Sequence, residues 1–341
     1  MRFFGNRLGK EQCMGSLTER FLARERESLS EFAFLTENTK GRLSPLAPSE
    51  FRTEFQRDRD RIIHSKSFRR LMHKTQVFFA PVDEHYRTRM THTLEVTQIS
   101  RIIARALSLN EDLTEAIALG HDLGHTPFGH AGETALRRCF DETFSHAKQS
   151  LRVVDHLDKL NLTYEVRDGI LNHSGSSVAE TLEGVVVRFA DRIAYINHDF
   201  DDACRAGVLS EDDLPFDIRY SLGDDSSSRI NTMVSSIVEH SGKEIRMADD
   251  IQRAADSLRE FMFTAVYRDA RVKGEEQKAQ DMLIRLYEHY IKNPDKLPRV
   301  YLDRLEEDGL PACAADYVAG MTDRYAIETY KEIFVPRVWR D

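Results

Sequence analysis

Hydrophobic residues recur at helical spacing along almost the whole chain, and the period-two alternation typical of strands is scarce. For example, Ile99, Ile103 and Ala106 share one face of a predicted helix. The nearest candidate for a strand, residues 185–187, lies inside a longer helical pattern over 180–208. We therefore predict an all-α fold.

Turn-forming residues divide this pattern into separate helices. Glycine and proline place loops over 36–50 and 210–228 and a turn over 124–129. The predicted helices cover about 17–34, 51–76, 91–107, 113–119, 131–140, 149–158, 163–173, 180–208, 229–241, 249–272, 275–292, 298–308 and 313–333.

The composition is that of a helical globular protein. The chain has 341 residues, 41% hydrophobic and 31% charged, with a net charge of −9, so non-specific attraction to nucleic acid or to an anionic membrane is not favoured. The four cysteines form no CxxC pair, which argues against a cysteine zinc site and fits a reducing compartment. No apolar run is long enough to span a membrane, and the N-terminus lacks the apolar core of a signal peptide. We expect a cytoplasmic protein.

Histidine is concentrated in one part of the sequence. Eleven of the 13 histidines lie within 64–198, and the segment 121–130 carries three of them together with Asp122. Neutral imidazole and carboxylate are the ligand types that hold a divalent metal while leaving positions for water or a phosphate oxygen. The sequence therefore indicates a metal-dependent enzyme that acts on a phosphate ester.

Four residues are candidates for the metal ligands. His121 and Asp122 are adjacent at a helix end and can both reach one ion, and His92 and Asp191 lie on other predicted helices. A buried carboxylate such as Asp191 is expensive without a cation or a strong donor. The alternatives are a hydrogen-bonded core histidine at 92 and an ion pair between Asp191 and one of the arginines at 188 and 192.

Two further pairs of side chains are spaced to share helix faces. His121 and His125 are four positions apart, and His130 and Glu133 are three positions apart. The turn at 124–129 would let both pairs line one cavity. The alternative for Glu133 is an ordinary carboxylate in the first turn of a helix, where the helix dipole favours it.

The order His92, His121-Asp122, Asp191 resembles the ligand order of the HD-domain metal-dependent phosphohydrolases. The surrounding sequence is similar to that of the bacterial deoxyguanosine triphosphate triphosphohydrolase-like proteins, densely from about 50 to 200 and more thinly afterwards. The strings that carry this resemblance are 55–65, Arg69-Arg70-Leu71, Lys74-Thr75-Gln76-Val77-Phe78, Arg89-Met90-Thr91-His92-Thr93-Leu94-Glu95-Val96, 121–130, Phe261-Met262-Phe263 and Val266-Tyr267.

The resemblance implies a fold, an HD-domain helical bundle with additional C-terminal helices. We expect an N-terminal helical and loop extension over 1–50 and an HD catalytic core over 51–209. A C-terminal helical region over 210–341 would pack on that core.

The resemblance also implies a reaction. Metal-activated water attacks the α-phosphorus of a deoxynucleoside triphosphate, and the products are the deoxynucleoside and tripolyphosphate. Water bound to a divalent cation has a lowered pKa, so hydroxide becomes available near neutral pH. Nitrogen and oxygen ligands together suit manganese, magnesium, iron, cobalt or nickel without choosing between them. The family name points to dGTP as one candidate substrate, but the sequence does not select a base.

By resemblance, several residues act on the phosphates and on the leaving group. His125 and His130 would contact substrate phosphates, and Glu133 would orient the attacking water or a histidine. His146 would be the general acid that protonates the departing 5′ oxygen, since an imidazole pKa near the working pH suits that role. The family has asparagine where this chain has Ala147. The alternative for His146 is a surface loop histidine.

Other residues would bind the rest of the substrate. Arg89 could bind a phosphate bidentately, and Arg192 could do likewise. By resemblance Tyr195 packs against C2′ of the deoxyribose, Asp199 accepts from the 3′-hydroxyl, and Gln76 is a third sugar contact. The alternatives are a solvated surface charge for Arg89 and a solvated acidic helix end for Asp199.

The run 57–61 alternates arginine and aspartate. It could be a salt-bridged helix face. It could instead form an inter-subunit or regulatory nucleotide site, because related enzymes are homo-oligomers regulated by bound nucleotides or single-stranded DNA.

Two other functions compete with deoxynucleoside triphosphate hydrolysis. One is another HD-type nucleotide phosphohydrolase, such as a nucleotidase or a signalling-nucleotide hydrolase. The other is a catalytically weak regulator that binds nucleotide or single-stranded DNA. Product analysis separates the first from the leading hypothesis, and tight binding without turnover would indicate the second.

Overall fold

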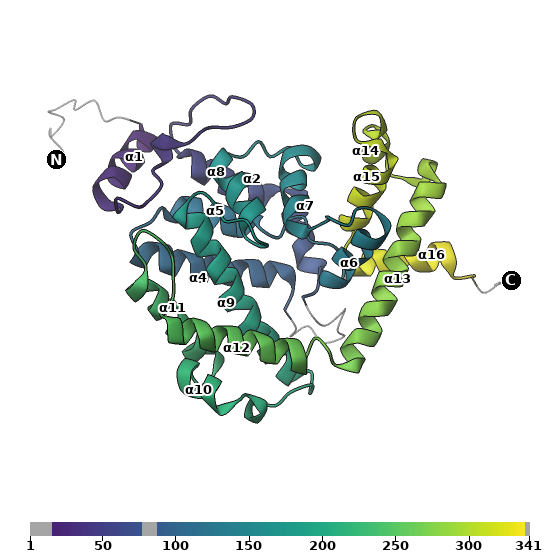
Figure 1. Cartoon of the computed structure of the whole chain (residues 1–341). Coiled ribbons are helices and arrows are strands. Elements are labelled where there is room, and N and C mark those ends of the chain that lie inside the picture. Colours follow the sequence, from purple (N-terminus) through teal and green to yellow (C-terminus); the bar gives the residue numbers. More distant parts are fainter. Residues whose placement is uncertain (1–15, 77–86, 338–341) are drawn as a thin grey trace, which may run out of the picture.

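The computed structural model describes residues 16–76 and 87–337, and it confirms the all-α prediction for them. Sixteen α-helices lie in these residues, and the only β-pairing among them is two isolated bridges (Figure 1). No helix among the described residues is long and apolar enough to cross a membrane. Residues 1–15, 338–341 and the family string at Val77 and Phe78 lie outside the described residues.

The helices follow one another with short connections. The first eight are α1 (Leu17–Ser28), α2 (Glu54–His64), α3 (Lys66–Arg70), α4 (Arg89–Ala106), α5 (Glu111–Gly120), α6 (His130–Cys139), α7 (His146–Arg152) and α8 (Tyr164–Asn172). The second eight are α9 (Leu182–Arg205), α10 (Phe216–Leu222), α11 (Ser226–His240), α12 (Asp249–Ala265), α13 (Ala270–Lys292), α14 (Arg299–Leu302), α15 (Leu305–Ala319) and α16 (Asp323–Phe334). Short 3-10 turns cover Thr36–Asn38, Leu71–His73, Glu211–Asp213 and Pro294–Lys296, and a π-helical turn covers Val153–Leu157.

Two predicted helices are divided by capping residues. The predicted helix over 51–76 is interrupted at Ser65, whose backbone is extended and whose hydroxyl accepts from the Phe68 amide to begin α3. The predicted helix over 313–333 is divided by Thr322, which caps α16 in the same way through the Tyr325 amide. Each capping oxygen satisfies an amide that has no partner within its helix.

The loop predicted over 210–228 is wrong in part, because it contains α10. Pro215 precedes the first residue of this helix, and Gly223 follows its last residue with a φ of 117°. Ile218 and Leu222 are buried, and α10 packs against α12. Burial of these two side chains stabilises a helix too short to form alone.

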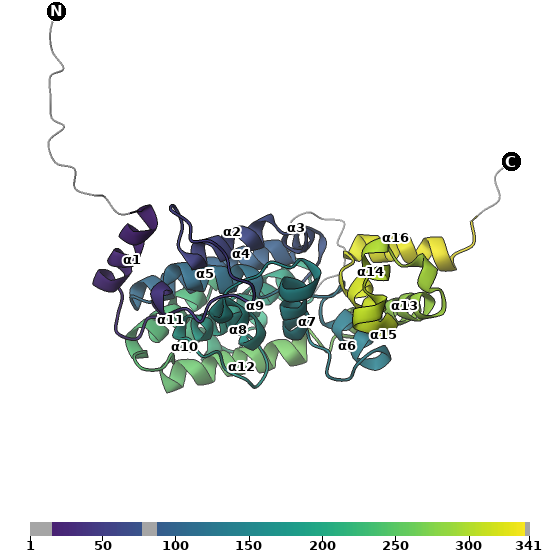
Figure 2. The ribbon, with the colours of Figure 1, turned by 90° about the horizontal axis from the view of Figure 1, so that it is seen from above.

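Buried hydrophobic side chains form two clusters. The larger cluster is built by α2–α5 and α8–α12, and the smaller one joins α6 to α13, α15 and α16. Figures 1 and 2 show α13–α16 together at one side of the molecule, next to α6. The helices after residue 210 therefore divide between the clusters, and the histidine-rich segment before α6 lies where the clusters meet.

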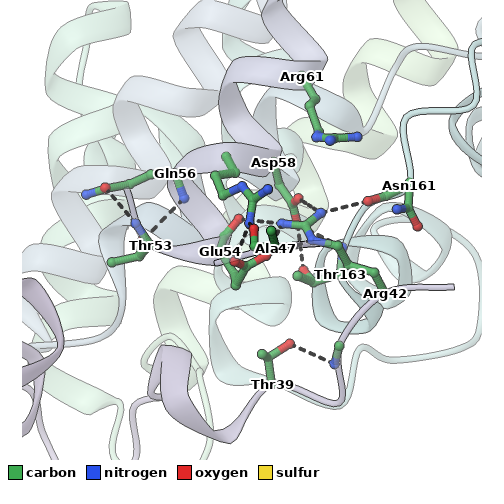
Figure 3. Close-up of polar contacts among 12 residues, drawn as sticks. Thr39, Arg42, Ala47, Thr53, Glu54, Gln56, Asp58, Arg61, Asn161 and Thr163 are labelled. Atoms are coloured by element: carbon green, nitrogen blue, oxygen red, sulfur yellow. Dashed lines mark hydrogen bonds and ion pairs between the residues drawn. The ribbon is translucent and has the colours of Figure 1, made fainter. Parts of the chain in front are cut away.

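The alternating charges at 57–61 have partners within the chain, and Figure 3 shows those of Asp58. Asp58 is buried, is ion-paired with Arg42, and accepts hydrogen bonds from the amide and hydroxyl of Thr163 at 2.8 and 2.6 Å. The other partners are Glu54 for Arg57, Glu115 for Arg59, Arg52 for Asp60 and the Leu160 carbonyl for Arg61. These contacts agree with a salt-bridged helix face.

Candidate metal centre and active site

Two packed helices bring His92 and Asp191 together. His92 lies in the first turn of α4 and Asp191 lies within α9, and their Nε2 and Oδ1 atoms are 3.1 Å apart. Arg188 instead donates to the carbonyls of Gly175 and Ser177. Histidines are therefore the neighbours of Asp191, as expected for a shared ion.

His121 presents one ring nitrogen to the same place. Its Nδ1 lies 2.6 Å from the Ala118 carbonyl, which can only accept, so Nδ1 carries the proton. Its Nε2 is buried and has no hydrogen-bond partner among the described residues. This atom lies 3.7 Å from Asp122 Oδ1 and 3.9 Å from Asp191 Oδ1. A buried lone pair without a donor is costly unless a cation satisfies it.

These donors fit a divalent metal. The ligand atoms offered by His92, His121 and Asp191 lie within 4.8 Å of one another. Burial opposes the charged form of Asp191, but His92 and His121 hold its pKa below the ordinary value. Imidazole nitrogens and a carboxylate are the ligand set expected for the metals named above.

Asp122 is held in its ionised form. It is buried, and its Oδ2 accepts a hydrogen bond of 2.7 Å from Arg89. Burial disfavours the carboxylate, yet Arg89 and the surrounding histidines keep the pKa of Asp122 well below its ordinary value. Arg89 is buried too, so the surface-charge alternative for it is wrong.

Arg89 also has capacity for a ligand. Its Nε is buried and has no partner among the described residues. A Cβ built on Gly129 would lie 3.0 Å from its guanidinium and 2.9 Å from the Gln76 carbonyl. Arg89 and the Gln76 backbone thus border the turn that leads to His130.

Glycines let residues 121–130, the histidine turn, pack tightly against neighbouring backbone. A Cβ on Gly124 would lie 2.1 Å from the Ser150 amide and 2.2 Å from the Gln149 carbonyl carbon. Only glycine therefore lets α7, which begins at His146, approach the turn. Gly129 precedes α6 with a φ of 57°, a backbone conformation that glycine adopts without strain.

His125 and His130 lie on this turn, and His146 of α7 lies next to them. The rings of His125 and His146 stack with centroids 4.7 Å apart, and His130 lies 5.8 Å from the first and 6.2 Å from the second. Burial lowers the pKa of His125 well below its ordinary value, so its ring is neutral. His130 is exposed, at the open end of the group.

Glu133 and His146 form an acid–base pair in which Glu133 is buried and His146 is half-buried. His146 Nδ1 lies 2.7 Å from Glu133 Oε2, and its backbone amide donates to the same oxygen at 3.3 Å. Burial opposes the charged ring, but the hydrogen bond to Glu133 raises the pKa of His146. Although burial raises the pKa of Glu133, His146 and Arg137 lower it to about 2. The alternative of a surface loop histidine is wrong. Glu133 does lie in the first turn of α6, but it is also paired with His146 and Arg137.

His173 belongs to the same group and was missed in the sequence. It follows α8, is buried, and directs Nδ1 to the Ile170 carbonyl at 2.7 Å. Its Nε2 lies 3.1 Å from His146 Nε2. His173, Asp122 and His146 form a second group whose ligand atoms lie within 4.8 Å of one another. Its position at the end of the helix predicted over 163–173, near other histidines, was the available signal.

The remaining predicted residues lie along α9. Asp199 is buried and accepts a hydrogen bond from the Tyr267 hydroxyl, and its Oδ1 has no partner among the described residues. Burial raises the pKa of Asp199 to about 7, so it is not a solvated helix end. Tyr195 and Arg192 are half-buried on the same helix, and the described residues give Arg192 no hydrogen bond or ion pair. Tyr267 was identified in the sequence only as part of a family string.

Family comparisons agree with this arrangement. A model of the HD domain matches residues 89–196, and a model of the phosphohydrolase-associated domain matches residues 245–332. The first match contains all four candidate metal ligands.

Curated relatives match over most of the chain. A deoxyguanosinetriphosphate triphosphohydrolase-like protein of Caldanaerobacter subterraneus subsp. tengcongensis is 53% identical over 92% of this chain and 95% of its own length. The protein of the same name from Desulfatibacillum aliphaticivorans is 48% identical over 94% of this chain and 99% of its own. A solved phosphohydrolase from Bacteroides thetaiotaomicron aligns with a TM-score of 0.49 at 16% identity, over 80% of this chain and 67% of that one.

Proposed function

Because this chain belongs to the deoxyguanosinetriphosphate triphosphohydrolase-like family of HD-domain proteins, we propose that it hydrolyses deoxynucleoside triphosphates to deoxynucleoside and tripolyphosphate. The observation that carries this proposal is that the metal-ligand group adjoins the Glu133–His146 pair, since the ligand atoms of Asp122 and His146 lie within 4.8 Å of each other. A metal ligand set beside a positioned acid is what hydrolysis of a phosphate ester requires.

His92, His121, Asp122 and Asp191 would hold a divalent cation. Such a cation would lower the pKa of a coordinated water and so supply hydroxide near neutral pH. The tautomer of His121 supports this role. Its protonated Nδ1 donates to the Ala118 carbonyl, so the lone pair of its Nε2 is free to coordinate a metal.

His146 would protonate the leaving group. Water adds to the α-phosphorus, the bond from phosphorus to the 5′ oxygen breaks, and that oxygen takes a proton from His146. Glu133 fixes the ring through Nδ1 and favours its charged form, so the proton to be transferred would be the one on Nε2, which lies 3.1 Å from His173 Nε2. His125 and His130, on the same turn, would bind phosphate oxygens together with Arg89.

The sugar would lie against α9. Tyr195 would exclude a 2′-hydroxyl, and Asp199 would accept from the 3′-hydroxyl, with Gln76 and Arg192 at the border of the site. The unsatisfied Asp199 Oδ1 supports this placement, because a buried acceptor lacks a donor there. Tyr267 holds the other carboxylate oxygen.

The test is product analysis with the full-length protein. Each of the four deoxynucleoside triphosphates is incubated singly and in mixtures with manganese, and the products are separated by chromatography. Deoxynucleoside and tripolyphosphate would support the proposal, and a comparison of single with mixed substrates would reveal activation by a nucleotide. Monophosphate with pyrophosphate, or orthophosphate alone, would overturn it in favour of another HD phosphohydrolase. Tight nucleotide or single-stranded DNA binding without turnover under several metals would indicate a regulator.

The relatives' name further points to dGTP as the first base to compare. We also expect a homo-oligomer, which light scattering on the purified protein would detect.

A further inference from the structure

Three side chains from packed helices meet beside the candidate metal ligands. His146 begins α7, His173 directly follows α8, and Asp122 lies two residues after α5; α5 and α7 both pack against α8. Asp122 and His173 are buried, and His146 is half-buried. The atoms that the three residues offer to a ligand lie within 4.8 Å of one another. One ion could therefore contact all three.

Hydrogen bonds place a proton on Nδ1 of both histidines. His173 Nδ1 lies 2.7 Å from the Ile170 carbonyl, which can only accept. His146 Nδ1 lies 2.7 Å from Glu133 Oε2, which accepts because this carboxylate is ionised. Histidines that bind a metal almost always donate their other ring N–H to a carbonyl or a carboxylate in this way. Both rings are thus oriented as metal ligands are, with Nε2 as the ligand atom.

The two Nε2 atoms lie 3.1 Å apart. Two nitrogen lone pairs at this distance repel each other unless a positive group lies between them. A proton on His146 is one such group, and a metal cation is another. Zinc–nitrogen bonds of about 2.0–2.1 Å at a tetrahedral angle place two ligand nitrogens about 3.3 Å apart. The spacing of the two rings is therefore close to that of a zinc site, and the Asp122 carboxylate adds an oxygen ligand.

Another set of nearby groups has less need of a cation. His125, Glu133 and His146 also offer ligand atoms within 4.8 Å of one another. However, the Glu133 carboxylate already accepts from His146 Nδ1 and is ion-paired with Arg137. The facing Nε2 atoms of His146 and His173 are therefore the better place for an ion.

We propose that His146 Nε2, His173 Nε2 and the Asp122 carboxylate bind a second divalent cation of the zinc type, and that this cation inhibits the enzyme. The inhibitory part rests on the function proposed above, in which the proton on His146 Nε2 goes to the leaving group. When the cation binds, this N–H bond breaks, the proton passes to solvent, and the nitrogen lone pair binds the metal. Proton transfer and occupation of this site exclude each other, so turnover falls as free zinc rises.

The test begins with the full-length protein loaded with manganese. Zinc chloride is titrated in, unbound metal is removed by dialysis, and elemental analysis counts both metals. We expect about one zinc per chain to bind while manganese is retained. We also expect kcat with dGTP to fall about 10²-fold or more, because a general acid contributes about 10²- to 10⁴-fold.

The variant that tests the ligand set is His173→Asn. Asparagine keeps an N–H for the Ile170 carbonyl and has no atom at the position of Nε2. We expect zinc affinity to fall at least about 100-fold, since loss of an outer-shell partner alone costs about 10- to 100-fold. The zinc concentration that halves the variant's own rate should rise by a similar factor, with manganese content unchanged. The control is His156→Ala, an exposed histidine outside these ligand groups, which should bind zinc within about twofold of the unmodified protein.

X-ray absorption at the zinc edge of the unmodified protein keeps the test decisive if His173→Asn does not fold. We expect nitrogen and oxygen neighbours at about 2.0–2.2 Å, and a sulfur neighbour at about 2.3 Å would overturn the site in favour of a cysteine. Zinc that replaces manganese one for one, or that binds His173→Asn as tightly as the unmodified protein, also overturns the site.

The two readouts separate this proposal from the proposed function. Zinc that binds beside manganese without slowing turnover overturns the inhibitory role and leaves the proposed hydrolysis intact. If the protein hydrolyses no deoxynucleoside triphosphate but takes up zinc through His173, the proposed function fails and the second cation site is supported.

Discussion

At the candidate centre, backbone carbonyls determine which ring nitrogen of two histidines carries the proton. His121 and His173 each direct Nδ1 to the carbonyl three residues earlier, at 2.6 and 2.7 Å. The Nε2 of His121 is thereby left with a lone pair that has no partner among the described residues, and the Nε2 of His173 lies 3.1 Å from His146 Nε2. Both histidines directly follow a helix, and a carbonyl of that helix fixes the tautomer of each ring.

The first prediction separates metal retention from proton transfer. Asp191→Ala removes a ligand, so the protein should lose its metal on dialysis. His146→Ala should keep the metal and lose about 10²- to 10⁴-fold in kcat, the usual contribution of a general acid. Elemental analysis and steady-state rates measure the two effects. A near-normal rate for His146→Ala with a full metal complement would refute the assignment.

The second prediction concerns pH. Because Glu133 raises the pKa of His146, the ring stays protonated to higher pH, and kcat should fall as pH rises through that raised pKa. In Glu133→Gln the anion is gone, so the alkaline limb should move to lower pH by about one unit. Profiles of kcat against pH check this, with Glu142→Gln, an exposed carboxylate, as the control. Superimposable profiles for Glu133→Gln and the unmodified protein would contradict it.

The sequence predicted the candidate metal ligands, but it did not predict which distant residues would hydrogen-bond to the site. His92, His121 and Asp191 were predicted as ligands, and their ligand atoms do lie together. The hydrogen bond between Tyr267 and Asp199 joins residues 68 positions apart, and a lone tyrosine gives no periodic signal that would indicate such a contact. Local spacing can predict a shared helix face, but it cannot predict which distant helix covers it.

At the scale of elements, Gly124 allows α7 to pack closely against the histidine turn. Gly124→Ala would drive a methyl group into the backbone at Gln149 and Ser150, at 2.2 and 2.1 Å. We expect a loss of about 1–3 kcal/mol in unfolding free energy and a lower kcat, because His146 begins the displaced helix. Urea denaturation measures the first effect.

The control for this substitution is Gly242→Ala. Nothing lies within 4 Å of a Cβ built on Gly242, and its φ is not in the left-handed region. We expect its unfolding free energy to change by less than about 0.5 kcal/mol. Equal stabilities of the two variants would show that α7 does not need glycine at 124.

The observed helix boundaries depend on interactions that the hydrophobic pattern of the sequence does not reveal. The pattern predicted one helix over 51–76, and the structure ends α2 at His64 because Ser65 caps α3 instead of continuing α2. The loop predicted over 210–228 contains α10, whose two buried side chains are too few to form a visible period. Capping and tertiary burial therefore decided the elements that spacing alone misassigned.

At the scale of the whole molecule, buried polar contacts join the C-terminal helices to the histidine turn. Lys74 donates to the Ala319 carbonyl at 2.9 Å and to the His125 carbonyl, and these contacts span 245 and 51 residues of sequence. Burial lowers the pKa of Lys74 to about 7. The phosphohydrolase-associated segment therefore contributes to the shape of the histidine turn as well as packing against it.

Asp323 makes the most connected of these contacts, and its removal should show how far the turn depends on α16. Its carboxylate accepts from the Thr75 amide and from the Phe128 amide, each at 3.0 Å, and from the Thr75 hydroxyl. Asp323→Ala would leave two amides without an acceptor, at about 1–3 kcal/mol for each that stays buried.

We expect this variant to unfold at lower urea and to turn over more slowly, because Phe128 precedes Gly129 and His130. Asp303→Ala is the control, since that exposed carboxylate is ion-paired with the exposed Arg299, at 2.8 Å, and a surface pair contributes about 0–1 kcal/mol. If both variants unfold at the same urea concentration, α16 does not support the turn. If Asp323→Ala loses stability but keeps full kcat, α16 stabilises the fold without shaping the catalytic residues.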